Sequence, residues 1–246
     1  MTFETFLAGF TLPHIVAGAS ALISFWCAAL SRKGRPFHRN AGRVYLLAML
    51  AIIVTAVPLS AVLFLRGMPV VGTFMTYLVV LVAFNCRNAW RAVVFRRQFE
   101  RYASRSMQVS ALLLALTGLT VVAIGVVHQA PILIAFGSIG PITAWQAFKL
   151  VRKGPARSNW WLVEHFGAMI GNGVATHVAF LQVGLINAFP GLDLALVRNL
   201  GWFGPLLVAV IAGFWLSRRY GRGAVLSSRP NLSNRPWSSG SSSSSP

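Results

Sequence analysis

Seven long runs of apolar residues dominate the chain, each bounded by charged residues or by proline and glycine. Every run has at least 17 residues, close to the roughly 20 that a helix needs to cross the hydrocarbon core of a bilayer. We therefore predict an all-α polytopic bundle of seven transmembrane helices. The predicted spans are Thr11–Leu30, Val44–Leu65, Val70–Cys86, Val109–Val127, Ile132–Val151, Trp161–Ile186 and Leu200–Leu216.

The basic residues alternate from one side of these runs to the other. All of the 22 lysines and arginines except Arg66 and Arg198 lie in or beside the connections that follow the first, third, fifth and seventh runs. Because cationic loops resist translocation, we expect that side to be cytoplasmic. The pattern predicts an N-terminus outside, a C-terminus inside and an odd number of spans.

The predicted organisation has three parts. Residues 1–10 form a short extracytoplasmic segment, residues 11–217 the transmembrane domain, and residues 218–246 a basic and then serine-rich cytoplasmic tail. The first segment contains no lysine or arginine, so the first run lacks the basic region of a signal peptide and we expect it to be retained. The tail composition cannot bury a core, which predicts disorder there.

Composition changes the picture by excluding other classes of protein. Hydrophobic residues make up 56% of the chain and charged residues only 11%, which excludes an ordinary soluble globule. The net charge of +18 would suit a nucleic-acid binder, but the alternation explains it through membrane orientation. We expect the partners to be the lipid bilayer and its anionic lipids at the cytoplasmic basic loops, with no nucleic acid.

Ionisable residues inside a span are costly in lipid, so each is a candidate for function. His14 in the first run shares a helix face with Ala17, Gly18 and Ala21. Small residues let another helix approach closely, so this histidine is expected to face protein. It is interpreted either as a hydrogen bond to a neighbouring helix or as a ligand-binding or proton-carrying group.

The sixth run is the most polar. At 100° per residue, one stripe of its helix contains four residues: His165, Met169, Asn172 and Thr176. His177 lies about 120° from His165 around the axis. Glu164, beside His165 near the inner end, is either half of a proton-accepting pair or an interface residue. Glycines in this run predict close helix packing, so we expect the first and sixth helices near the centre of the bundle.

His38 lies between the first two runs, on the inner side and at the depth of His165. The two imidazoles are candidates to bind a metal or a haem, or to hydrogen-bond to the backbone. A b-type haem held by His14 and His177 would have to overcome a depth mismatch of roughly 9 Å. The histidine spacings do not match a zinc hydrolase, and no metal site is assigned.

Three stretches resemble the bacterial membrane proteins of the domain of unknown function 2306 family: His14-Ile-Val-Ala-Gly18, His38-Arg-x-x-Gly42-Arg43-x-Tyr45 and Trp161-x-x-x-His165-x-x-x-Met169. That family often carries arginine just before the last methionine, where this chain has Ala168. The likeness covers most of the membrane region and not the serine tail. It implies a polytopic bundle with three histidines to watch and no established activity.

We therefore expect an integral membrane protein of a bacterial inner (plasma) membrane that binds a small ligand or ion within the bundle. The ligand-binding or proton-handling candidates are His14, His38, Glu164, His165, Asn172 and His177. Two alternatives stay open: a redox protein that holds b-type haem or quinone through histidines, and a structural or assembly subunit. No catalytic residue is assigned, and the sequence leaves open whether the protein is an enzyme.

Overall fold

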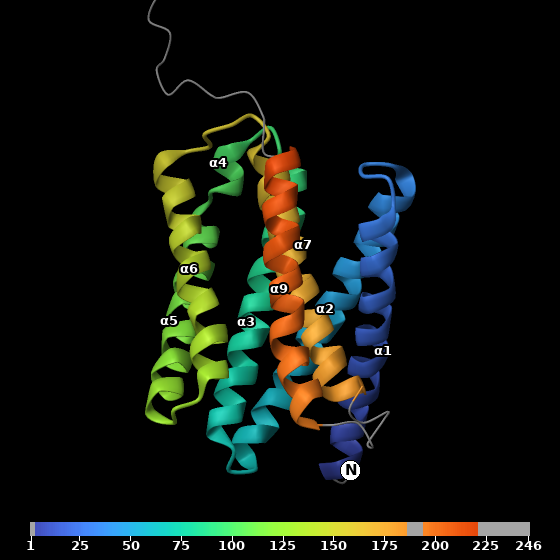
Figure 1. Ribbon diagram of the computed structural model, residues 1–246, viewed down its shortest axis with the longest axis vertical. Coiled ribbons are helices and arrows are strands. Elements are labelled where there is room, and N and C mark those ends of the chain that lie inside the picture. Colours follow the sequence, from blue (N-terminus) through green and yellow to red (C-terminus); the bar gives the residue numbers. More distant parts are fainter. Residues whose placement is uncertain (1–2, 186–193, 221–246) are drawn as a thin grey trace, which may run out of the picture.

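The computed structural model describes residues 3–185 and 194–220. In these ranges seven long α-helices run side by side along one axis (Figure 1). They are α1 (Phe3–Leu30), α2 (Pro36–Leu65), α3 (Pro69–Val94), α5 (Arg105–Val127), α6 (Pro131–Lys153), α7 (Trp160–Ala179) and α9 (Leu194–Tyr220). A single-turn helix, α4 (Phe99–Tyr102), precedes α5, and a short π-helix, η1 (Phe180–Leu185), continues α7. The serine-rich tail lies outside the described residues.

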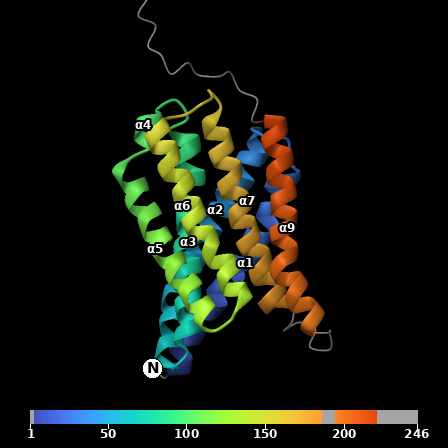
Figure 2. The same cartoon turned by 60° about the vertical axis from the view of Figure 1, so that its left-hand side comes forward.

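Six of these helices are long and apolar enough to cross a membrane: α1, α2, α3, α5, α6 and α9. The chain is therefore a multi-pass integral membrane protein whose helices contact the bilayer. The predicted sixth span, which is α7 with η1, is not among the six, because glutamate, histidine and asparagine interrupt its apolar residues. It lies beside the others in the bundle (Figure 2).

The outer surface has the character expected of a lipid-facing protein. Large aliphatic side chains are exposed along the helices, and on α9 Leu207, Val208 and Ile211 are each at least 60% exposed. Only 6% of the most apolar stretch of α9 is buried inside the protein. Apolar surface on this scale suits contact with acyl chains rather than water.

The turns explain where the helices begin. Pro36, Pro69 and Pro131 start α2, α3 and α6, at the position where proline's missing N–H costs nothing. Gly34 and Gly67 adopt positive φ in the tight connections on either side of α2. These features make helical hairpins of α1 with α2 and of α5 with α6.

α3 occupies the centre of the bundle. It packs against α2, α5, α6 and α7, whereas α1 packs mainly against α2 and α7 at the edge (Figure 1). The prediction that the first helix lies near the centre was therefore wrong. Its buried residues Ala17, Ala21, Ser24 and Ala28 are small, and larger side chains such as Ile23 are exposed. α7 lies against α3, α9 and α1, as its polar composition predicts.

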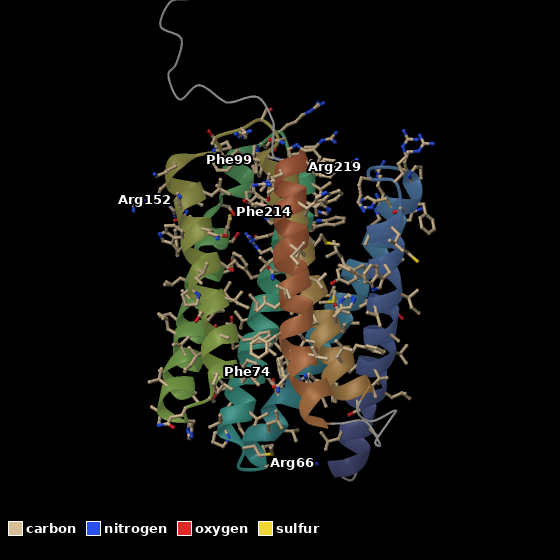
Figure 3. All side chains as sticks on the ribbon, viewed as in Figure 1. Arg66, Phe74, Phe99, Arg152, Phe214 and Arg219 are labelled. Atoms are coloured by element: carbon tan, nitrogen blue, oxygen red, sulfur yellow. The ribbon has the colours of Figure 1, made fainter. Side chains whose placement is uncertain are left out.

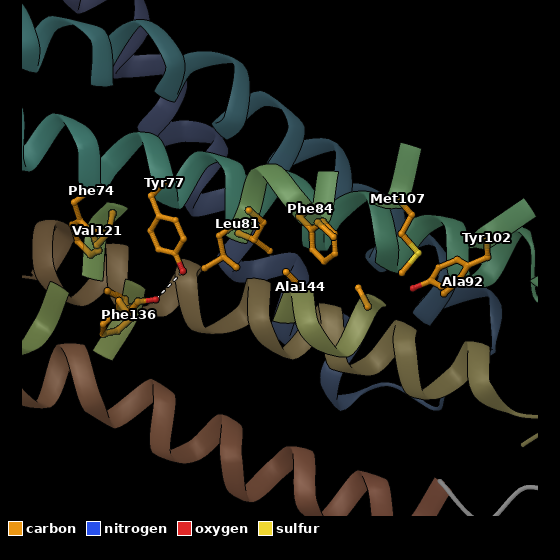
Figure 4. Close-up of a cluster of buried hydrophobic side chains, with 14 of the residues drawn as sticks. Phe74, Tyr77, Leu81, Phe84, Ala92, Tyr102, Met107, Val121, Phe136 and Ala144 are labelled. Carbon is orange, nitrogen blue, oxygen red and sulfur yellow. Dashed lines mark hydrogen bonds between the residues drawn. The ribbon is translucent and has the colours of Figure 1, made fainter. Parts of the chain in front are cut away.

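The main core lies between α3, α5 and α6 (Figure 4). Phe74, Tyr77, Leu81 and Phe84 form one face of α3 and are all buried. The Tyr77 hydroxyl donates to the Phe136 carbonyl of α6 at 2.7 Å, so this buried phenol is satisfied.

Glycines bring α5 and α6 into close contact. A Cβ added to Gly118 would lie 2.7 Å from the Gly137 carbonyl oxygen, and one added to Gly140 would lie 2.8 Å from the Leu114 carbonyl oxygen. Both distances are shorter than van der Waals contact, so only glycine fits there. α6 remains continuous through Pro141.

The ends of the bundle differ in charge (Figure 3). Arg152 and Arg219 lie at the end where α1, α3, α6 and α9 finish, which we call the basic end. Arg66 lies at the opposite end, where α1 begins.

Candidate functional site

The polar face of α7 turns inward, toward α2 and α3. Asn172 and Thr176 lie one turn apart on this face and both are buried. Gly171, beside them, lets α3 approach: a Cβ there would lie 2.9 Å from the Asn85 amide nitrogen. The close approach places Asn85 of α3 against the glycine that precedes Asn172 on α7.

Asn172 has one satisfied and one unsatisfied polar atom. Its side chain is 0% exposed, and its Nδ2 donates to the Cys86 sulfur at 3.2 Å. Its Oδ1 has no hydrogen-bond partner among the residues that the structure describes. An amide oxygen with no partner in an apolar interior costs about 1–3 kcal/mol.

Tyr45 joins α2 to the same site. The Thr176 hydroxyl donates to the Asn172 main-chain carbonyl at 3.0 Å, and the Tyr45 hydroxyl lies 3.2 Å from the same threonine oxygen. Because threonine has one proton to give, the tyrosine is the donor of this pair. We refer to the group as the central polar cluster, and its members are Tyr45, Asn85, Cys86, Asn172 and Thr176.

His165 and His38 lie toward the basic end, on α7 and α2. His165 Nδ1 donates to the Ala89 carbonyl at 2.9 Å, and His38 Nδ1 donates to the Ala28 carbonyl at 3.0 Å. Each Nε2 has no hydrogen bond within the described part of the chain. A backbone carbonyl on one ring nitrogen fixes the tautomer and orients the other nitrogen toward a ligand.

Glu164 has a partner that sequence reasoning missed. The Tyr102 hydroxyl of α4 donates to Glu164 Oε2 at 2.9 Å, and Tyr102 is 0% exposed. Burial, and then the negative charge of Glu164, raise the pKa of the Tyr102 hydroxyl far above its usual range. The tyrosine is therefore a neutral donor at any physiological pH. No hydrogen bond joins Glu164 to His165 in the described residues.

Two arginines of α3 complete the surroundings of Tyr102. Arg87 donates to the Ser106 hydroxyl at 2.7 Å, and Arg91 donates to the Ser104 hydroxyl at 3.3 Å and to the Arg101 carbonyl. Both guanidinium charges act on Tyr102. The sequence placed these arginines in a cytoplasmic connection but offered no sign that they hold the start of α5.

His14 and His177 link helices through their side chains. His14 Nδ1 lies 2.8 Å from the Thr55 hydroxyl of α2. His177 Nε2 accepts from Trp26 Nε1 at 2.9 Å, while its Nδ1 donates to the Gly173 carbonyl at 2.7 Å. Both nitrogens of His177 are therefore engaged.

These bonds decide which histidines fit a haem or a metal. A ligand to iron must offer an imidazole lone pair, and that of His177 is engaged by Trp26. His177 therefore does not fit, whereas His38 and His165 keep a free Nε2. Within the described ranges, no three or more histidine, cysteine, aspartate or glutamate residues gather as a metal site.

Comparison with protein-family models, with curated proteins and with solved structures finds no match to the chain.

Proposed function

We propose that this membrane protein binds a small ligand or ion at the central polar cluster, with His38 and His165 at its inner mouth. The observation that carries the proposal is the unsatisfied Asn172 Oδ1 at a fully buried position. Such an atom is rare in folded proteins unless something supplies its partner. A cation, or a ligand that donates a hydrogen bond, would supply it.

The surrounding groups favour an occupant that is small and carries little charge. Tyr45, Thr176 and Asn172 offer neutral oxygens, and no aspartate, glutamate, lysine or arginine belongs to the cluster. A multivalent ion would not be neutralised there, since buried charges need charged partners. A monovalent cation or a small hydrogen-bonding molecule fits this chemistry.

The first test replaces Asn172 with leucine, which has the same branching and the same number of side-chain heavy atoms but no polar atoms. With no ligand, Asn172→Leu removes an unsatisfied group and should stabilise the protein by about 1 kcal/mol or more. With a ligand, the same change should remove ligand-dependent stability. Thr117→Val is the control, because that hydroxyl bonds to the Leu113 and Leu114 carbonyls of its own helix.

The measurement is thermal unfolding of detergent-purified protein in sodium, potassium and choline buffers, with native mass spectrometry of the same samples. We expect either one cation to raise the melting temperature of the wild type but not of Asn172→Leu, or a bound mass that Asn172→Leu loses. Equal or greater stability of Asn172→Leu in every buffer, with no bound mass, would contradict the proposal.

The proposed orientation gives this site its direction. We propose that α7 with η1 is a seventh span and that the basic end is cytoplasmic, in a bacterial plasma membrane. The alternation of lysine and arginine supports both statements. His38 and His165 would then meet a ligand that arrives from the cytoplasm, and the likeness to the domain of unknown function 2306 family includes the same two histidines.

A second candidate function is the binding of b-type haem or a metal ion by His38 and His165. The observation in its favour is that both rings fix Nδ1 on a carbonyl and leave Nε2 free. A visible absorbance spectrum before and after dithionite, with metal analysis, tests it. A Soret band that shifts on reduction and is lost in His165→Ala would support this candidate, and a colourless, metal-free sample would exclude it.

A further inference from the structure

A groove on the outer side of α1 is distinct from the central polar cluster. Its volume is about 720 Å³, and it is lined by Leu22, Ile23, Trp26, Cys27, Leu30, Ser31 and Phe37. Apart from the serine, every lining side chain is apolar or a thiol. Ile23, Leu30 and Phe37 are each more than 60% exposed, so the described part of the chain leaves this lining uncovered.

The length of the groove matches one leaflet of a bilayer. From Leu22 to Ser31 the helix rises by roughly 14 Å. Half of the hydrocarbon core is about 15 Å thick. The groove ends at the basic end of the bundle, because Ser31 closes α1 there and Gly34 turns the chain so that Phe37 returns to the rim. An extended acyl chain is the apolar molecule of this length that a membrane supplies.

The rim carries positive charge with no nearby acid in the sequence. Arg32, Arg35 and Arg39 are exposed beside the groove, and the chain has no aspartate or glutamate between Glu4 and Glu100. Lys33 Nζ donates to the carbonyls of Ala28 and Ala29 at the end of α1, which leaves one of its three protons for another acceptor.

The start of α2 adds a second attraction for an anion. Its N-cap residue is Arg35, and no side chain caps the helix there. Pro36 has no N–H, so the N–H groups of Phe37 and His38 are the first that lack an intrahelical partner, and the positive end of the helix dipole lies beside the arginines. An acyl-length groove that ends at unpaired N–H groups and basic side chains has the chemistry of an anionic phospholipid site.

We propose that the groove on α1 binds an anionic phospholipid, with an acyl chain along Ile23, Trp26 and Leu30 and the phosphate at the basic rim. A zwitterionic lipid fills the same groove but gains less at the rim. Each basic residue near a membrane surface strengthens the binding of an anionic lipid about fivefold. Selectivity for the headgroup therefore resides in the arginines and occupancy in the apolar lining.

The test uses Trp26 as the reporter. The full chain is reconstituted into phosphatidylcholine vesicles that contain a small fraction of phosphatidylglycerol or phosphatidylcholine with brominated acyl chains, which quench tryptophan at contact. The difference between wild type and Trp26→Phe isolates the signal of the groove. We expect brominated phosphatidylglycerol to quench that signal several-fold more effectively than brominated phosphatidylcholine.

Two triple variants of equal charge separate a site from a general surface effect. The rim triple combines Arg32→Gln, Arg35→Gln and Arg39→Gln. It should bring the ratio of quenching by brominated phosphatidylglycerol to quenching by brominated phosphatidylcholine close to one, while quenching itself persists. The control triple combines Arg96→Gln, Arg97→Gln and Arg101→Gln. It removes the same charge from exposed positions after α3 and should leave the ratio unchanged. The proposal would be overturned if both triples lost the preference for phosphatidylglycerol equally, or if the wild type showed a quenching ratio of one. It would also be overturned if Trp26→Phe left the quenching unaltered.

A second readout does not depend on tryptophan. Native mass spectrometry of protein released from mixed-lipid nanodiscs should show one retained phosphatidylglycerol on the wild type and on the control triple. The rim triple should retain none or should retain both lipids equally. Retention of phosphatidylglycerol by the rim triple at the wild-type level would also overturn the proposal.

Discussion

At the scale of single residues, the histidines are separated by what their nitrogens do. His177 uses both nitrogens within the protein, whereas His38 and His165 each keep one free. The sequence placed all of them in or beside spans, but spacing along a helix does not reveal which partner a nitrogen finds. Tyr102 was missed for a related reason, because it lies 62 residues from Glu164 in a short connection.

Loss of the bond between Tyr102 and Glu164 should be costly, because it would leave a buried carboxyl oxygen without its donor. We expect Tyr102→Phe to destabilise the protein by about 1.5–3 kcal/mol. In a protein that already carries Glu164→Gln, Tyr102→Phe should cost less stability. The double-mutant cycle is measured by thermal unfolding in detergent. Additive effects of the two substitutions would show that the pair contributes no coupling.

His14 and His38 should respond differently to truncation. His14→Ala removes the bond to Thr55 between α1 and α2 and should cost about 1 kcal/mol of stability without affecting ligand-dependent stabilisation. His38→Ala should instead change the rate at which a ligand reaches the central polar cluster. Thermal unfolding measures the first effect. The binding kinetics of the cation or molecule found in the buffer and mass-spectrometry experiment measure the second. Identical behaviour of the two variants would contradict these roles.

At the scale of helices, hydropathy predicted where each long helix lies but not where every one of them ends. α1, α2 and α5 end at the predicted Leu30, Leu65 and Val127. α3 continues past the predicted Cys86 to Val94, because helical hydrogen bonding persists through polar residues beyond the apolar core. Neighbours could not be predicted from one sequence, which is why α3 rather than α1 proved central.

The glycine contact between α5 and α6 makes a prediction at this scale. Gly118→Ala would place a methyl group 2.7 Å from the Gly137 carbonyl and should destabilise the pair by about 1–3 kcal/mol. Gly167→Ala on α7 is the matched control, since nothing lies within 4 Å of its Cβ position. That substitution should be neutral or stabilising by up to about 1 kcal/mol. Thermal unfolding in detergent compares the two, and equal melting temperatures would count against close packing.

At the scale of the whole molecule, the proposed seven spans place Arg97 and Ser217 inside and His128 outside. An impermeant maleimide should label His128→Cys in intact cells, and should label Arg97→Cys and Ser217→Cys only after permeabilisation. The background is Cys27→Ala with Cys86→Ala, since both cysteines are free. If α7 does not cross, Ser217→Cys will be labelled from outside.

The central place of α3 has a consequence for the order in which the protein is made. Cys86 of α3 meets Asn172 only after 86 more residues have been added. At synthesis rates of about 5–20 residues per second, that interval is roughly 4–17 s. During this time Asn85 and its neighbours lack the helix that later covers them, in a solvent that cannot hydrogen-bond to them. A ribosome that stalls before α7 therefore leaves a chain with polar groups exposed to lipid, which membrane chaperones and proteases can recognise as unfinished.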